Sequence, residues 1–168
     1  MERTTIKLLT EYLPRYGWAA FNVVEDTTAG GKIMTGWGSP IGGVRPMFIT
    51  IDHQKDTLLV VCPALAAAPQ DAMPVGQLAD TLTAVGFANY AMLLGRFCYD
   101  PQDGEIRYED GMPIDGAQMS YGQFEHMLNA TVASVTYWAP RMQEAAMGAR
   151  TGDSVVQSFL GHAAGFAR

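Results

Sequence analysis

The sequence is poor in the residues that would place it in several common protein classes. It has two cysteines in 168 residues, too few for the disulfide framework of a small secreted domain. Only 11 residues are Lys or Arg, against 17 that are Asp or Glu, and the basic ones are scattered. Nucleic-acid binding needs clustered basic residues. The net charge of −6 therefore argues against nucleic acid as a partner.

Long hydrophobic runs are also missing. No run approaches the roughly 20 apolar residues of a membrane-spanning helix, and the N-terminal stretch MERTTIKLLTEYL lacks the apolar centre of a signal peptide. We therefore expect a cytoplasmic protein without membrane insertion. Cys62 and Cys98 lie in apolar, strand-like runs and are expected to be buried free thiols.

What is present indicates a globular domain. Hydrophobic residues make up 48% of the chain and charged residues 17%, a composition typical of a well-filled fold. A chain of this length buries about 70% of its unfolded surface. We expect residues 1–150 to form a single domain and residues 151–168 to form a C-terminal tail with a short amphipathic helix.

The clearest local signal is a β-hairpin between an apolar run ending at Tyr99 and the alternating segment Glu105 to Tyr108. Asp100 and Pro101 suit the first two positions of a type I turn, and Gly104 suits a left-handed position. The pattern predicts a strand from Tyr90 to Tyr99 and a second strand after Gly104.

A helix follows the hairpin. Ser120 stands three residues before Gln123, the spacing of a capping box, and apolar residues then recur at helical spacing. Pro140 is expected to end or kink this helix because proline removes a hydrogen bond within a helix.

The remaining elements complete an α+β pattern. A first helix is predicted over 3–16 and a middle helix from Val75 to near Gly86, with four strands between them at 18–25, 32–37, 46–52 and 57–62. Residues 63–74 are predicted to form an extended connector. The predicted fold is a bent antiparallel sheet with helices on one side, in the order α-β-β-β-β-α-β-β-α plus the tail helix.

Three features invite a chemical interpretation that their spacing does not support. The Gly-rich stretch 36–43 lacks the Lys-Ser/Thr ending of a phosphate-binding loop and is better interpreted as a mobile loop between strands. The carboxylates of the hairpin region do not keep calcium-loop spacing and are interpreted as turn formers. The histidines lack metal-ligand spacing. We therefore assign no catalytic residue, metal or cofactor and expect no enzyme activity.

The run from Gly95 to Ser120, GRFCYDPQDGEIRYEDGMPIDGAQMS, with the helix opening QFEHML, resembles the C-terminal half of the YbjN-domain family. That family is similar in fold to the type III secretion chaperones. The resemblance implies a bacterial, acidic homodimer that holds an extended segment of another polypeptide, by adding a strand to a sheet edge or by taking apolar side chains into pockets. The two pairs of strands before the middle helix exceed the usual three strands of those chaperones.

Ten methionines and three tryptophans either form adaptable contact surfaces or fill the core. We predict a protein-binding, chaperone-like function; the alternative is a sensory or regulatory domain that binds a small apolar ligand. The partner-binding candidates are apolar residues in the early strands and the tail: Trp18, Phe21, Met34, Trp37, Met47, Phe159 and Leu160. The dimer-interface candidates lie on the middle helix: Leu78, Leu82, Val85 and Phe87.

Overall fold

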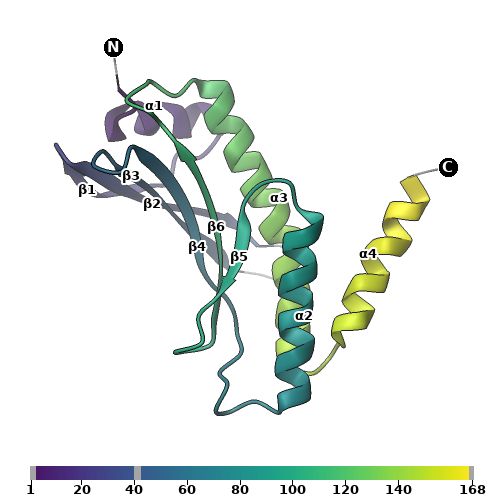
Figure 1. Ribbon diagram of the computed structural model, residues 1–168. Helices are drawn as coiled ribbons and strands as arrows, with labels where there is room; N and C mark the ends of the chain where they lie inside the picture. The colour runs from purple at the N-terminus through teal and green to yellow at the C-terminus, as the bar shows by residue number, and fades with distance from the viewer. Residues whose placement is uncertain (1–2, 40–42, 167–168) are drawn as a thin grey trace. The chain divides into compact units, whose positions relative to one another are not determined.

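The computed structural model describes residues 3–39 and 43–166. Six strands and four helices make up this described part (Figure 1). The strands are β1 (Asn22–Thr27), β2 (Gly30–Gly38), β3 (Val44–Asp52), β4 (Thr57–Ala67), β5 (Arg96–Tyr99) and β6 (Glu105–Pro113). The helices are α1 (Ile6–Tyr16), α2 (Val75–Ala91), α3 (Tyr121–Ala146) and α4 (Gly152–Phe166). The expected order of elements is confirmed, including the tail helix.

The strands form one antiparallel sheet in the order β1-β2-β3-β4-β6-β5. β4 lies inside this order, as its continuous apolar sequence predicts, whereas β1 and β5 are at the two ends. The expected α+β class is therefore confirmed. The chain forms two compact units, one of Met1–Pro63 and Glu109–Ala133, the other of Ala64–Tyr108 and Ser134–Arg168.

In the first unit, α1 covers the buried face of the sheet. The side chains of Ile6, Leu9 and Leu13 are buried at helical spacing on one face of α1. A methyl group added at Gly31 of β2 would lie 2.4 Å from the Ile6 side chain. Only glycine at this position allows α1 to approach the strand so closely.

A buried threonine holds the start of the chain in place. The Thr4 hydroxyl donates a hydrogen bond to the Ala117 carbonyl and accepts one from the Met119 amide, both at 2.8 Å. The neighbouring Thr5 caps α1 by accepting a hydrogen bond from the Leu8 amide. The chain start and the segment before α3 are thus joined without an unpaired hydroxyl.

In the second unit, α2 protects the outer side of β5. Asn89 of α2 bonds both backbone groups of Phe97: its Nδ2 donates to the carbonyl at 2.9 Å, and its Oδ1 accepts from the amide at 2.7 Å. The side chain therefore takes the place of a neighbouring strand at this residue.

Aromatic packing joins α4 to the other helices of the second unit, and α4 lies beside α2 (Figure 1). The Phe159 ring stacks on Trp138 of α3 at 5.3 Å between centroids and meets Phe87 of α2 edge-on at 5.5 Å. At the start of α4, the Gly152 amide donates to Asp80 of α2 at 2.8 Å. The tail is thus docked on its own chain.

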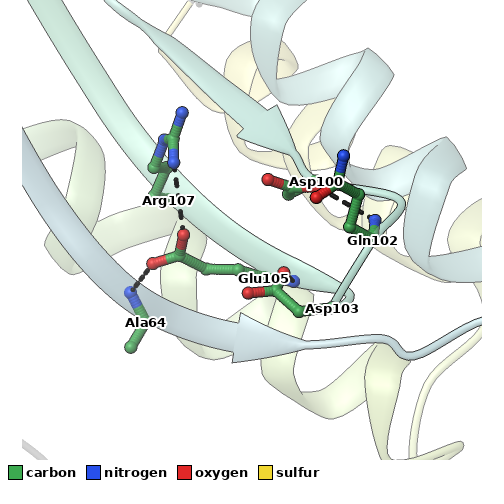
Figure 2. A network of polar contacts seen from close by, with 6 residues as sticks. All are labelled: Ala64, Asp100, Gln102, Asp103, Glu105 and Arg107. Carbon is green, nitrogen blue, oxygen red and sulfur yellow. Dashed lines mark hydrogen bonds and ion pairs between the residues drawn. The ribbon is translucent and has the colours of Figure 1, made fainter.

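The tip of the β5–β6 hairpin has the turn that its sequence predicts (Figure 2). Asp100 Oδ1 accepts from the Gln102 amide and Asp103 Oδ1 accepts from the Glu105 amide, each at 2.9 Å. Gly104 is left-handed, with φ of +77°. The capping box before α3 is present as well, since Ser120 and Gln123 each bond the other's backbone amide.

Several element limits differ from the sequence predictions. The strand predicted from Tyr90 is wrong in its first half, because α2 continues through Gly86 to Ala91 and β5 begins at Arg96. Burial of Ala84 and Ala88 on α2 outweighs the low helix propensity of one glycine.

Proline had less effect on the elements than predicted. Pro140 lies inside α3, which continues to Ala146, and β4 runs past Pro63 to Ala67 into the predicted connector. The predicted loop 36–43 is also shorter than expected: Gly36 and Gly38 belong to β2, and residues 40–42 lie outside the described residues.

Candidate functional site

The first unit carries an open hollow of about 430 Å³ beside the start of β1. We call it the apolar hollow, since most of its lining side chains are apolar. It is lined by Ala20, Phe21, Asn22, Met34, Thr35, Gly36, Trp37, Gly38, Val44 and Pro46. Its lining thus comes from the residues before and at the start of β1, from the second half of β2 and from the start of β3.

Two glycines of β2 line the hollow. A Cβ at Gly36 would lie 2.3 Å from the Arg45 carbonyl oxygen of β3, so no side chain fits there. A Cβ at Gly38 would meet nothing within 4 Å, which leaves open space above the strand. Neighbouring Thr35 donates a hydrogen bond to the Ala20 carbonyl at 3.0 Å and so fixes the chain that enters β1.

Tryptophans support one wall of the hollow. The Trp37 ring, which lines it, stacks on Trp18 with 5.9 Å between centroids and 10° between planes. Trp18 in turn meets the Tyr16 ring edge-on at 5.1 Å. A stack of this kind holds large apolar surfaces in place beside the hollow.

The outer edge of β1 adjoins the hollow. All six residues of β1 are exposed, and no strand in the described part of the chain pairs with this edge. Val24 is the extra residue of a β-bulge, because the register passes from Val23 to Glu25 between Ile33 and Lys32. An open edge offers unpaired backbone groups to another extended chain.

The sheet face beside the hollow is apolar too. The register aligns Met34 of β2 with Phe48 of β3 and Phe48 with Val61 of β4. Met34 is 41% exposed, and the other two are half-buried. An adjacent row on the opposite face, formed by the isoleucines and Val60 of the same three strands, is fully buried. The exposed apolar row extends the hollow into a larger contact surface.

The structure brings four of the seven predicted partner-binding residues together. Phe21, Met34 and Trp37 line the apolar hollow, and Trp18 supports its wall. Met47 is fully buried, so its side chain fills the core and is not available to a partner.

The two tail candidates belong to the second unit. The Phe159 ring contacts the rings of Phe87 and Trp138, while Leu160 is 47% exposed. Sequence reasoning missed Val44 and the two glycines of β2. The Gly36-Trp37-Gly38 pattern is the available signal, although its glycines favour a loop when only the sequence is considered.

The predicted dimer-interface residues have different environments on α2. Leu82 is 38% exposed and Leu78 half-buried, whereas Val85 is buried. The Phe87 ring contacts the Phe159 ring of α4. The strongly exposed apolar residues here are instead ones that sequence reasoning did not select: Val75 and Tyr90 of α2, and Leu93, two residues past the end of that helix.

The carboxylates of the hairpin have structural partners. Glu105 Oε1 accepts a hydrogen bond from the Ala64 amide of β4 at 2.9 Å, and its Oε2 pairs with Arg107 at 3.4 Å (Figure 2). Ala64 has a left-handed φ of +51°, and this contact stabilises it. In the described part of the chain, no group of three or more acidic, His or Cys side chains is arranged to hold a metal ion.

One buried group has a strongly shifted pKa. Burial raises the pKa of the Cys62 thiol to about 12, although the positive charge of Arg45 lowers it in part. A thiol with such a pKa stays protonated and is a poor nucleophile. Cys62 is therefore part of the core rather than of a reactive site.

Comparison with known proteins identifies the family. Residues 5–144 match the YbjN family, which is described as "Putative bacterial sensory transduction regulator". The chain belongs to the YbjN family. The match ends before α4, so the tail helix of this YbjN chain lies outside it. No curated protein matches the sequence.

Solved structures share the YbjN fold at low sequence identity. An uncharacterized protein from Methanothermobacter thermautotrophicus has a TM-score of 0.59 and 16% identity, covering 82% of this chain and 96% of the other. A chain of the ExsC–ExsE complex has a TM-score of 0.50 and 15% identity, covering 82% and 92%. A chain of the HopA1–SchA chaperone–effector complex has a TM-score of 0.47 and 13% identity, covering 80% and 91%.

Both resemblances stated from the sequence, to the YbjN family and to the fold of type III secretion chaperones, are confirmed. The first two structures, at 16% and 15% identity, show the fold alone. Within the described residues, no helix is long and apolar enough to span a membrane.

Proposed function

We propose that this YbjN-family chain is a non-enzymatic, chaperone-like protein that holds an extended segment of another polypeptide. The segment pairs with the open edge of β1 and places an apolar side chain in the apolar hollow. The observation that carries the proposal is that the two features meet: Asn22 is both the first residue of β1 and part of the hollow's lining.

The free edge supplies affinity that does not depend on the partner's sequence. Backbone groups of β1 that point away from β2 can bond an added strand. The other end of the sheet is less accessible, because Asn89 already bonds both backbone groups of Phe97 in β5. Strand addition is therefore favoured at β1.

The hollow supplies selectivity for the partner's side chain. Its volume of about 430 Å³ accommodates a large apolar side chain together with part of its neighbours. Met34 and Val44, at 41% and 72% exposed, lose contact with water when such a side chain enters. Burying an apolar side chain of this size contributes about 1.5–3 kcal/mol.

A fluorescently labelled peptide of alternating Val and Thr residues with one central Phe tests the proposal by anisotropy titration. Gly38→Leu adds an apolar side chain to the lining of the hollow, and its Cβ would meet nothing within 4 Å. We expect this variant to bind the peptide at least about tenfold more weakly than the parent. Gly122→Leu, also in open space but outside the hollow, is the matched control. Equal binding by all three proteins would contradict the proposal.

A second candidate function is a sensory or regulatory domain that binds a small apolar ligand in the same hollow. The observation in its favour is the volume, which lies within the roughly 300–1,000 Å³ of small-molecule sites. Mass spectrometry of an organic extract of the purified protein separates the two functions. A stoichiometric organic ligand supports the sensor, and a stoichiometric polypeptide supports the chaperone-like function.

A cytoplasmic location fits this function. Within the described residues, Cys62 and Cys98 form no disulfide, as expected for a protein kept in a reducing compartment.

A further inference from the structure

We infer that the β1 edge selects an extended segment in which a Lys or Arg precedes a large apolar residue by two positions. This inference rests on the proposed function and adds the chemistry of the partner. The basic residue pairs with Glu25, and the apolar residue enters the apolar hollow. The added strand runs antiparallel to β1.

The bulge in β1 sets this spacing. Asn22 lies opposite Met34 and Glu25 lies opposite Lys32, and these two residues of β2 share a face because they are two positions apart. The extra residue Val24 therefore brings Asn22 and Glu25 to the same face of the sheet, although three positions separate them. A strand without a bulge that lies beside β1 covers the distance from Asn22 to Glu25 in two residue steps, about 7 Å.

β2 already pairs with the inner edge of β1 in this way. Along Lys32-Ile33-Met34, the basic residue stands opposite Glu25 and the apolar Met34 stands opposite Asn22. An antiparallel strand on the outer edge that repeats the basic-x-apolar order meets the same two positions of β1.

Glu25 is available for such a contact. It is exposed, and no ion pair to it is found in the described part of the chain. The ammonium of Lys32, its neighbour on β2, lies over the Phe48 ring at 5.7 Å. Glu25 also lines a second, more polar hollow of about 250 Å³. A long basic side chain that reaches Glu25 can rest in this space.

The other carboxylate in the second hollow is already engaged. Asp52 Oδ1 accepts hydrogen bonds from the Gln54 and Lys55 amides, and its Oδ2 pairs with the Lys55 ammonium at 3.3 Å. These contacts hold the pKa of Asp52 below its ordinary value, the Lys55 amide contributing most. Glu25 is therefore the carboxylate left to receive a basic partner.

Charge also disfavours the alternative in which two β1 edges pair with each other. Glu25 and Asp26 are adjacent and exposed, so self-pairing would bring like charges together. The net charge of −6 adds to this repulsion and attracts a basic segment at long range. The edge thus favours a basic partner over a second copy.

Four labelled peptides test the inference, all of alternating Val and Thr residues with one Phe. In the first three, the residue two positions before Phe is Lys, Gln or Glu; in the fourth, Lys is one position before Phe and so faces the other side. We expect the first peptide to bind about threefold more tightly than the Gln peptide at low salt, with the Glu peptide weakest. The tighter binding of the Lys peptide, which we call the Lys advantage, should vanish in about 1 M salt. The fourth peptide, with the displaced Lys, should bind no more tightly than the Gln peptide.

Two protein variants locate the contact. Glu25→Gln should remove the difference between the affinities of the Lys and Gln peptides. Asp26→Asn is the matched control, because Asp26 lies opposite Gly31, whose Cβ position faces α1, on the other side of the sheet. It should leave most of the Lys advantage in place.

The outcomes separate the inference from the proposed function. If the Lys and Gln peptides bind with equal affinity, the basic-x-apolar preference is wrong and the proposed function stands. The preference is also wrong if Asp26→Asn removes the Lys advantage as fully as Glu25→Gln does. If none of the peptides binds, the proposed function fails and the inference fails with it.

Discussion

Glycine positions decide local stability where the backbone is left-handed and a neighbouring chain segment lies close. Gly104 and Gly116 both have positive φ, +77° and +63°. A Cβ at Gly104 would also lie 2.4 Å from the Pro69 nitrogen, whereas one at Gly116 would meet nothing within 4 Å. We expect Gly116→Ala to destabilise the protein by about 1 kcal/mol and Gly104→Ala by about 3 kcal/mol or more. Urea unfolding measures both. Equal losses would mean that the close approach at Gly104 is wrong.

The Cys62 thiol makes stability depend on alkaline pH. Its pKa is about 12 in the folded protein, above the ordinary value of 9.0, so the folded state keeps a proton that the unfolded chain releases. This contribution is complete below about pH 9 and is lost as the pH rises toward 12. Cys62→Ala removes it.

The melting temperature should therefore fall less for Cys62→Ala than for the parent between about pH 8 and pH 10.5. Only the change of melting temperature with pH is compared between the two proteins, since the smaller side chain lowers stability at every pH. Parallel curves for the two proteins would show that Cys62 is not buried as described.

At the residue scale, the sequence predicted what depends on near neighbours. The Asp100 turn, the Gly104 conformation and the Ser120 cap need only residues within a few positions, and all three are present. The hollow depends on β2 meeting β3, a contact between different strands that local sequence does not reveal. For this reason the sequence around Gly36 and Gly38 favours a loop, although both residues belong to β2.

Among the elements, α4 was predicted from the sequence only as a short amphipathic helix, without its packing partners. Phe159 stacks on Trp138 and meets Phe87, while its neighbour Leu160 is 47% exposed. We expect Phe159→Ala to cost about 2 kcal/mol, less than for a fully buried Phe. Leu160→Ala should cost less than about 0.5 kcal/mol. Chemical denaturation measures the pair, and similar values for both would contradict the docked position of α4.

The limits of elements followed tertiary packing more than local signals. Gly86 and Pro140 are both typical of helix ends, yet α2 and α3 continue past them. Buried side chains on either side of each residue, such as Val85 and Ala88 for Gly86, favour continuation. Such contacts are formed by segments far apart in the sequence, so propensity alone misses them.

For the whole molecule, we expect a homodimer formed through the outward face of α2. Val75 and Tyr90 of α2, and Leu93 two residues past its end, are 84%, 86% and 95% exposed, and exposed apolar residues on and just after one helix mark an interaction surface. Light scattering at micromolar concentration should give twice the 18.2 kDa of one chain. Tyr90→Glu combined with Leu93→Glu should give the monomer mass. A mass near 18.2 kDa for the parent would contradict this expectation.

Hydrogen exchange at the backbone amides of β1 tests strand addition most directly. The parent protein is compared free and saturated with the peptide that carries Lys two positions before Phe. The amides of Asn22–Thr27 that point away from β2 should exchange at least about tenfold more slowly in the complex, while amides of α4 keep their rates. If the peptide binds and exchange throughout Asn22–Thr27 is unchanged, the partner is not held at the β1 edge.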